Sequence, residues 1–274
     1  MLGAFLVAAA TGLATTFGAV PFLFVRHVER RHYDTLLGFA AGLMLAAATL
    51  GLLSTALADV HLHGVLQIGR FSSVLAGFCS GVGLLSIMDR LIPHQHAGGH
   101  HAHVHHDHLH HDHDPALPDL NEAHAARKQG LLVVGVMSLH RLPEGFAIGA
   151  AWAGGGQALG VTLAIAVALQ NAVEGAVMAA PLRRGGLRPV ALLALVTATG
   201  LAIPVAALAG FVLSSIVHGA LPPLLALGAG ALLYLTCNEI VPESHSHGNE
   251  VRATFGLLSG FLFIVILRTV FPAD

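Results

Sequence analysis

The chain is divided by its hydropathy into long apolar runs separated by short polar connections. Eight runs reach the length of about 20 apolar residues that a helix needs to cross the hydrocarbon core of a membrane. No alternation of single apolar and polar residues competes with this pattern, so the chain is expected to be all-α. The pattern predicts a polytopic membrane protein with eight transmembrane helices, at roughly 2–25, 35–57, 72–92, 130–151, 158–181, 189–213, 221–242 and 253–271.

The composition agrees with this interpretation. Of the 274 residues, 55% are hydrophobic and 10% are charged, whereas a soluble domain carries about 25% charged residues. The formal net charge is −2, and no basic face indicates nucleic acid as a partner. The lipid bilayer is the expected environment, and the assembly is left open, with a homodimer as one alternative.

Pairs of glycines recur at a spacing of four in the predicted helices, as Gly38 with Gly42 and Gly77 with Gly81. Small residues at this spacing let transmembrane helices approach closely. Glycine is common in such helices, so each pair alone is a weak signal.

The distribution of basic residues predicts the orientation, because loops on the cytoplasmic side are rich in Lys and Arg. With the N-terminus outside, only Arg70 and Arg268 fall on the outer side, and Arg141 falls within a span. The inner loops then hold the other ten of the thirteen Lys and Arg residues: Arg26, Arg30, Arg31, Arg90, Arg127, Lys128, Arg183, Arg184, Arg188 and Arg252. We expect a multi-pass protein of the cell membrane with both termini outside.

A histidine-rich segment separates helices 1–3 (1–93) from helices 4–8 (128–274). Residues 94–127 cannot build an apolar core and are expected to form a disordered cytoplasmic loop. Neutral imidazoles bind Zn²⁺ and related ions readily, so a string of them predicts metal binding. The run is not explained as a polyhistidine affinity tag, because such a tag sits at a terminus of the chain. The predicted loop ligands are His100, His101, His103, His105, His106, His108, His110, His111 and His113.

Two polar pairs lie at membrane depth, His140 with Glu144 and Gln170 with Glu174. Four residues are about one helical turn, so each pair shares one helix face. Ionisable groups within a membrane are costly and indicate a functional site. These nitrogen and oxygen ligands suit Zn²⁺, Mn²⁺, Fe²⁺ or Cd²⁺. They predict a metal site between helices 4 and 5, with the metal as substrate and with no catalytic cofactor.

A simpler alternative is a buried salt bridge of Arg141 with Glu144 or Glu174 that holds helices together. That alternative leaves His140 and Gln170 unexplained.

Pro143 gives a further reason for a polar pocket at this depth. A proline inside a helix frees the carbonyl four residues back, here that of Leu139. At membrane depth a freed carbonyl is tolerated only within protein or beside a polar cavity.

The segment His140-Arg141-Leu142-Pro143-Glu144-Gly145 resembles the His-Asn-x-Pro-Glu-Gly signature of span four in Zrt-, Irt-like protein (ZIP) metal transporters. Gln170-Asn171-Ala172-Val173-Glu174-Gly175 is similar to the matching motif of span five. Weaker similarities at residues 37–42, 89–96 and 238–243, in the same order, extend the resemblance over nearly the whole chain.

The resemblance implies transport of a divalent metal, with zinc as the first choice, toward the cytoplasm. It places the primary ligands at His140, Glu144, Gln170 and Glu174. Arg141 stands where asparagine is usual and Asn171 where aspartate can occur, both at a second metal position. A guanidinium there should repel a second cation, so we predict one transport metal with Arg141 as counter-charge. The expected exit pathway groups are Asp89, His94, His96, Asn238 and Glu239.

Two other functions remain as alternatives. An intramembrane metallohydrolase is disfavoured because the chain has no His-Glu-x-x-His motif and no second strong histidine within the spans; we therefore expect no enzyme. A non-transporting metal sensor or scaffold, in which Arg141 locks the site, is the main alternative to transport.

Overall fold

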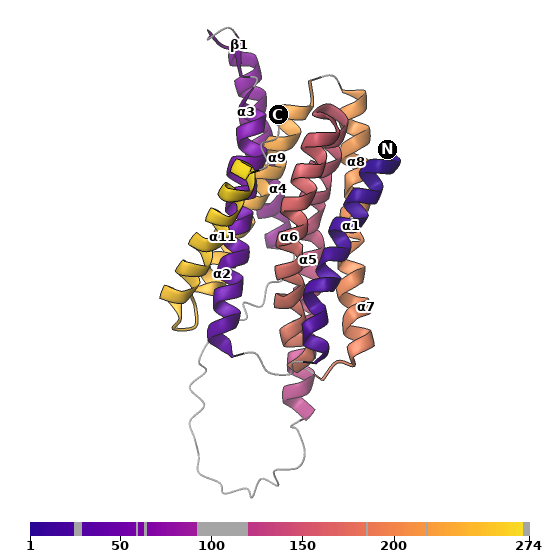
Figure 1. Ribbon diagram of the computed structural model, residues 1–274, viewed down its shortest axis with the longest axis vertical. Coiled ribbons are helices and arrows are strands. Elements are labelled where there is room, and N and C mark those ends of the chain that lie inside the picture. The colour runs from indigo at the N-terminus through magenta and orange to yellow at the C-terminus, as the bar shows by residue number, and fades with distance from the viewer. Residues whose placement is uncertain are drawn as a thin grey trace, which may run out of the picture.

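The apolar runs fold into long helices that pack side by side as an upright bundle (Figure 1). The computed structural model describes residues 1–24, 29–58, 60–62, 65–91, 120–184, 186–217 and 219–270. In chain order the helical segments are α1 (Leu2–Ala19) with η1 (Val20–Leu23), α2 (Arg30–Ala46) with η2 (Ala47–Leu53) and α3 (Ser54–Ala58), α4 (Ile68–Leu91), α5 (Leu120–Gly154), α6 (Gly156–Arg184), α7 (Pro189–Gly200) with α8 (Ala202–Ile216), α9 (Leu221–Leu235) with η3 (Thr236–Ile240) and α10 (Val241–Ser244), and α11 (Glu250–Val270).

These segments confirm the all-α class and the eight spans. Within the described residues, seven helical stretches are long and apolar enough to cross a membrane. The remaining span is α5, 35 residues long, which contains the predicted stretch 130–151. The start of α1 and the last turn of α11 lie at the same end of the bundle (Figure 1), as an even number of spans requires.

Two spans contain a short π-helical stretch that the hydropathy pattern did not indicate. These are η2, which continues α2, and η3, which follows α9. Such wide turns often occur at functional sites, and η3 carries two expected exit residues, Asn238 and Glu239. Two antiparallel strands of two residues each, β1 (His61–Leu62) and β2 (Val65–Leu66), follow the second span and form a hairpin. In this hairpin His61 pairs with Leu66.

Glycines bring several helix backbones into direct contact. Gly38 and Gly42 of α2 lie against the backbone of α11, and Gly77 and Gly81 of α4 lie against that of α9. The expectation of close helix approach at these two motifs is therefore confirmed. A Cβ atom at any of the four positions would overlap a carbonyl group of the neighbouring helix.

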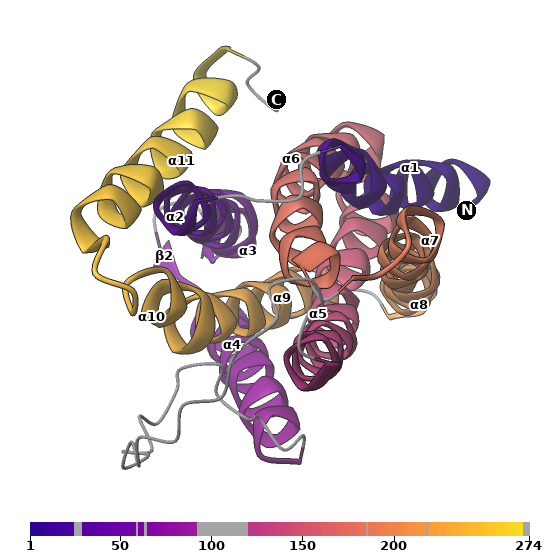
Figure 2. The same ribbon diagram turned by 90° about the horizontal axis from the view of Figure 1, so that it is seen from below.

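The same kind of contact joins the helices around the predicted metal ligands. Gly149 of α5 lies against the backbone of α8, and Gly175 of α6 lies against that of α1. Seen along the bundle axis, α2 lies between α11 and α6, while α5 lies between α6 and α9 (Figure 2). The helix α5 packs most extensively against α8 and α6.

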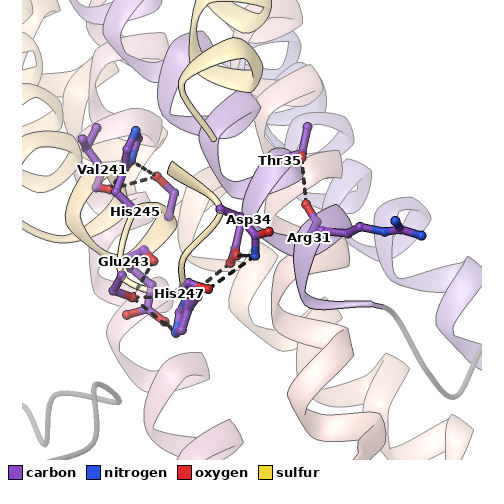
Figure 3. A network of polar contacts seen from close by, with 10 residues as sticks. Arg31, Asp34, Thr35, Val241, Glu243, His245 and His247 are labelled. Carbon is purple, nitrogen blue, oxygen red and sulfur yellow. Dashed lines mark hydrogen bonds and ion pairs between the residues drawn. The ribbon is translucent and has the colours of Figure 1, made fainter. Parts of the chain in front are cut away.

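A polar network ties the start of α2 to the turn between α10 and α11 (Figure 3). The fully buried carboxylate of Asp34 accepts a hydrogen bond from Asn249 Nδ2 at 2.8 Å, and its Oδ1 lies 3.2 Å from His247 Nδ1. His247 Nε2 lies 3.8 Å from Glu243 Oε1. A buried carboxylate needs such partners, so this network determines how the ends of α2, α10 and α11 meet.

The histidine-rich tract from His94 to His113 lies outside the described residues. The helix α5 begins at Leu120, so it includes residues 120–127, which the sequence analysis placed in the loop.

Candidate metal centre

The predicted ligands of α5 and α6 meet in the buried centre of the bundle. His140 and Glu144 lie one turn apart on α5, and Gln170 and Glu174 lie one turn apart on α6. All four side chains are buried. The helix α5 is continuous through Pro143, so the proline sits inside the helix between the two α5 ligands.

Gln170 joins the two carboxylates. Its Nε2 donates to Glu144 Oε1 at 2.6 Å and to Glu174 Oε1 at 3.0 Å. The amide hydrogens therefore occupy one oxygen of each carboxylate. Hydrogen bonds to a charged acceptor are about twice as strong as neutral ones, so the Gln170 amide helps to hold the two acidic groups close together.

Two oxygen atoms of this group have no hydrogen-bond partner among the described residues: Glu144 Oε2 and Gln170 Oε1. A buried oxygen without a donor carries a desolvation penalty of about 1–3 kcal/mol, more when it is charged. One belongs to α5 and the other to α6. A cation or a water molecule bound between the helices would remove this penalty.

Arg141 is completely buried beside these groups. Its Nη1 donates to Thr199 Oγ1 at 2.7 Å, and its Nη2 lies 3.6 Å from Glu174 Oε2. The Thr199 hydroxyl donates to the carbonyl of Val196 at 2.7 Å, so its lone pairs remain for the guanidinium. The α7 residue Thr199 was missed by sequence reasoning, because a single threonine in an apolar helix gives no signal of its own.

Asn171 points away from the four ligands toward α1. Its Nδ2 donates to the carbonyl of Thr11 at 3.3 Å, and its Oδ1 has no hydrogen-bond partner among the described residues. The Thr11 hydroxyl donates to the carbonyls of Val7 and Ala164. Arg141 and Asn171 are thus both engaged with neighbouring helices, α7 and α1.

One expected exit residue contacts the centre directly. Glu239 of η3 places Oε1 3.7 Å from His140 Nε2. Asn238 precedes it in η3 and is exposed. Asp89 lies near the end of α4, but its side chain is outside the described part, as are His94 and His96 and the nine predicted loop ligands.

Within the described ranges, no group of three or more His, Cys, Asp or Glu side chains is arranged so that it could hold a metal ion. The reason is visible in the contacts. The Gln170 amide lies between the carboxylates, Arg141 faces Glu174, and His140 faces Glu239. Coordination of a metal by the four predicted ligands therefore requires the Gln170 amide to turn so that its oxygen, instead of its nitrogen, faces the carboxylates.

Together these features define a polytopic α-helical membrane protein whose buried polar centre lies on two neighbouring helices. The chain belongs to the ZIP family, because the family model described as ZIP Zinc transporter matches residues 1–268. The resemblance of the signature motifs is thereby confirmed.

Several curated proteins are similar over most of the chain. The zinc transporter ZIPB of Bordetella bronchiseptica is 35% identical over 258 residues, which cover 93% of this chain and 77% of that protein. The zinc transporter GufA of Myxococcus xanthus is 33% identical over 270 residues, 97% and 98% of the two chains. The zinc transporter ZupT of Corynebacterium glutamicum is 28% identical over 274 residues, 99% and 100% of the two chains.

Proposed function

We propose that this protein carries a divalent metal ion, with zinc as the first choice, across the membrane toward the cytoplasm. The ion binds between α5 and α6 at a single site formed by His140, Glu144, Gln170 and Glu174. The observation that carries the proposal is the pair of buried oxygens without a hydrogen-bond partner among the described residues, Glu144 Oε2 on α5 and Gln170 Oε1 on α6. The zinc transporters among the relatives support the choice of ion.

The ligand set suits a site that must also release its ion. The two carboxylates supply two negative charges for a divalent cation, while His140 and Gln170 add neutral ligands. Gln170 Nε2 bonds to both carboxylates, so these hydrogen bonds hold the two glutamates together. The ion competes with these bonds, which lowers its affinity to a range that permits release.

The charge of the centre supports one ion instead of two. Arg141 already contributes one positive charge beside Glu174. One divalent ion adds two positive charges, which the two carboxylates can balance, whereas a second ion would add two more within a buried region that already holds the guanidinium. Arg141 therefore acts as a resident counter-charge and occupies the position of a second ion.

A second candidate function is a metal sensor or scaffold that binds the ion without transporting it. The buried contact of Arg141 with Glu174 and its hydrogen bond to Thr199 favour this candidate, because they hold one ligand in place. Membership of a transporter family favours transport, and it argues against an enzyme.

We further propose the orientation that the basic residues predict, with both termini outside and residues 94–127 in the cytoplasm. The histidines of that loop then bind metal on the side where transported ions are released. Glu239 of η3 lies 3.7 Å from His140, so in this proposal it receives the ion first on its way to this side, followed by the exposed Asn238.

Uptake of zinc into proteoliposomes tests the proposal. Glu144→Gln and Glu174→Gln each remove one carboxylate and keep the shape of the side chain. Because a contact with a charged group contributes about 1.5–3 kcal/mol, uptake at low zinc should fall roughly ten- to a hundredfold. Glu250→Gln, at an exposed position in the first turn of α11, is the matched control and should keep full uptake.

Unchanged uptake in both carboxylate variants would refute the proposed site. Zinc binding by the wild-type protein, with uptake no faster than in empty liposomes, would instead establish the sensor or scaffold.

A further inference from the structure

A groove of about 460 Å³ lies between the second, fifth and eighth spans, and none of the predicted metal ligands lines it. One wall is α6, and the opposite wall is formed by η2, α3 and α11. The lining residues are Ala47, Gly51, Thr55, Leu159, Thr162, Leu163, Ile165, Ala166, Ile264, Leu267 and Arg268. Its volume lies in the range of about 300–1,000 Å³ that is typical of ligand pockets.

Small residues in both walls help to form the groove. Ala47 and Gly51 of η2 and Ala166 of α6 are all small, so the two walls leave space that larger side chains would fill. The exposed side chain of Ile165 lines the groove, so the space opens at the surface of the bundle that faces lipid.

The interior of the groove requires no hydrogen bonds from an occupant. The Thr55 hydroxyl donates to the carbonyl of Gly51 at 2.7 Å, and the Thr162 hydroxyl donates to that of Ala158 at 3.0 Å. Both polar side chains are thus bonded to their own helix. The remaining lining residues up to Leu267 are apolar or glycine, so hydrocarbon is the matching chemistry.

One end of the groove carries a positive charge. Arg268 lies in the last turn of α11 and is the one charged residue among the described lining residues. Its Nη1 donates to Ser54 Oγ at 3.3 Å, and no carboxylate among the described residues forms an ion pair with it. A helix of 21 residues spans about 31 Å, so its last turn lies at the depth of lipid headgroups.

We propose that this groove binds one anionic phospholipid, with an acyl chain between α6 and α11 and the phosphate on Arg268. A guanidinium binds phosphate by paired hydrogen bonds, and it does so more strongly when no protein carboxylate competes. The apolar walls accept the acyl chain and not the headgroup, and Arg268 binds an anionic headgroup in preference to a zwitterionic one. With the N-terminus outside, the bound lipid belongs to the outer leaflet.

The proposal does not rest on the metal site, and its test measures lipid binding alone. The full-length protein is stripped of lipid in a neutral detergent and titrated with phosphatidylglycerol or phosphatidylcholine of the same acyl chains. Bound lipids are counted by native mass spectrometry. We expect one phosphatidylglycerol to bind at least about tenfold more tightly than phosphatidylcholine, as expected for one charge-assisted contact.

Three variants locate the binding. Arg268→Gln should weaken phosphatidylglycerol binding roughly ten- to a hundredfold, to the level of phosphatidylcholine. Ala166→Leu fills the groove and should weaken both lipids. Arg70→Gln, which removes the other basic residue expected on the outer side, is the matched control and should change neither. Thermal unfolding of each variant confirms that it is folded.

Equal affinity of the wild-type protein for the two lipids would overturn the proposal. So would a preference for phosphatidylglycerol that survives in Arg268→Gln, or one that is lost equally in Arg70→Gln, since the selectivity would then arise from diffuse surface charge.

Discussion

Replacement of Arg141 separates its structural contribution from its effect on metal stoichiometry. The wild-type guanidinium has its Nη2 3.6 Å from Glu174 Oε2 and its Nη1 2.7 Å from Thr199 Oγ1. At an effective dielectric constant of about 20, opposite charges 3.6 Å apart attract by about 5 kcal/mol. Measured losses after removal of one partner of a buried ion pair are about 3–5 kcal/mol, because the other charge remains buried alone.

Two substitutions at this position form a matched pair. Arg141→Met and Arg141→Asn both remove the charge, so both should lower the stability of the metal-free protein by about 3–5 kcal/mol. Asparagine alone adds an oxygen ligand. Zinc should restore more stability to each variant than to the wild type, because the ion supplies the positive charge that Glu174 has lost.

The assay combines thermal unfolding in detergent, with and without zinc, and metal counting after equilibrium dialysis. All proteins lack residues 97–114, so that loop histidines do not contribute to the count. The wild type and Arg141→Met should bind one ion per chain, and Arg141→Asn should bind two. Two tightly bound ions in the wild type, or one in Arg141→Asn, would refute the assignment of Arg141 as a counter-charge that occupies the second position.

Three further predictions concern packing, the polar network and the loop. Gly149→Leu should lower the thermal unfolding midpoint strongly, because its Cβ would meet the backbone of α8. Gly135→Leu on the same helix is the control, because the space around Gly135 is open, and it should leave the midpoint unchanged. Equal midpoints in the two variants would contradict the glycine contact. Asp34→Ala should destabilise the protein by about 1–3 kcal/mol, because the side chain loses its hydrogen bond and its ion pair. Glu29→Ala, at an exposed position, is the control. A chemical unfolding curve of Asp34→Ala that coincides with that of the wild type would contradict the prediction. Deletion of residues 97–114 should reduce the number of zinc ions bound per chain and leave the maximal uptake rate in proteoliposomes unchanged; complete loss of uptake in a correctly inserted deletion would show that the loop takes part in transport itself.

The spans could be predicted from the sequence because the membrane imposes a simple rule of length and hydropathy. The same rule gives no information on the backbone inside a span. The π-helical turns at Ala47–Leu53 and Thr236–Ile240 depend on how neighbouring helices pack, and hydropathy does not record this. The start of α5 at Leu120 was likewise missed, because a polar helical extension has the composition of a loop.

For the candidate site, too, the sequence predicts part of the arrangement and misses the rest. The one-turn spacing of Gln170 and Glu174 predicts that they share a face, and the structure brings them to the α5 residues Glu144 and His140. Spacing along one helix does not say which atom of an amide faces a carboxylate. The bridge from Gln170 Nε2 to both glutamates and the role of Thr199 arise from contacts between helices that lie far apart in the sequence.

The glycine contacts have a consequence for how the protein is made. The helix α2 fits its Gly38 and Gly42 against the backbone of α11, the last helix of the described chain. Synthesis delivers spans from the N-terminus onward, so α2 enters the membrane long before its partner exists. Until α11 is inserted, the glycine face of α2 must be covered by lipid or by a membrane chaperone. Truncation before residue 250 would therefore leave the nascent chain with an early helix that is open to degradation.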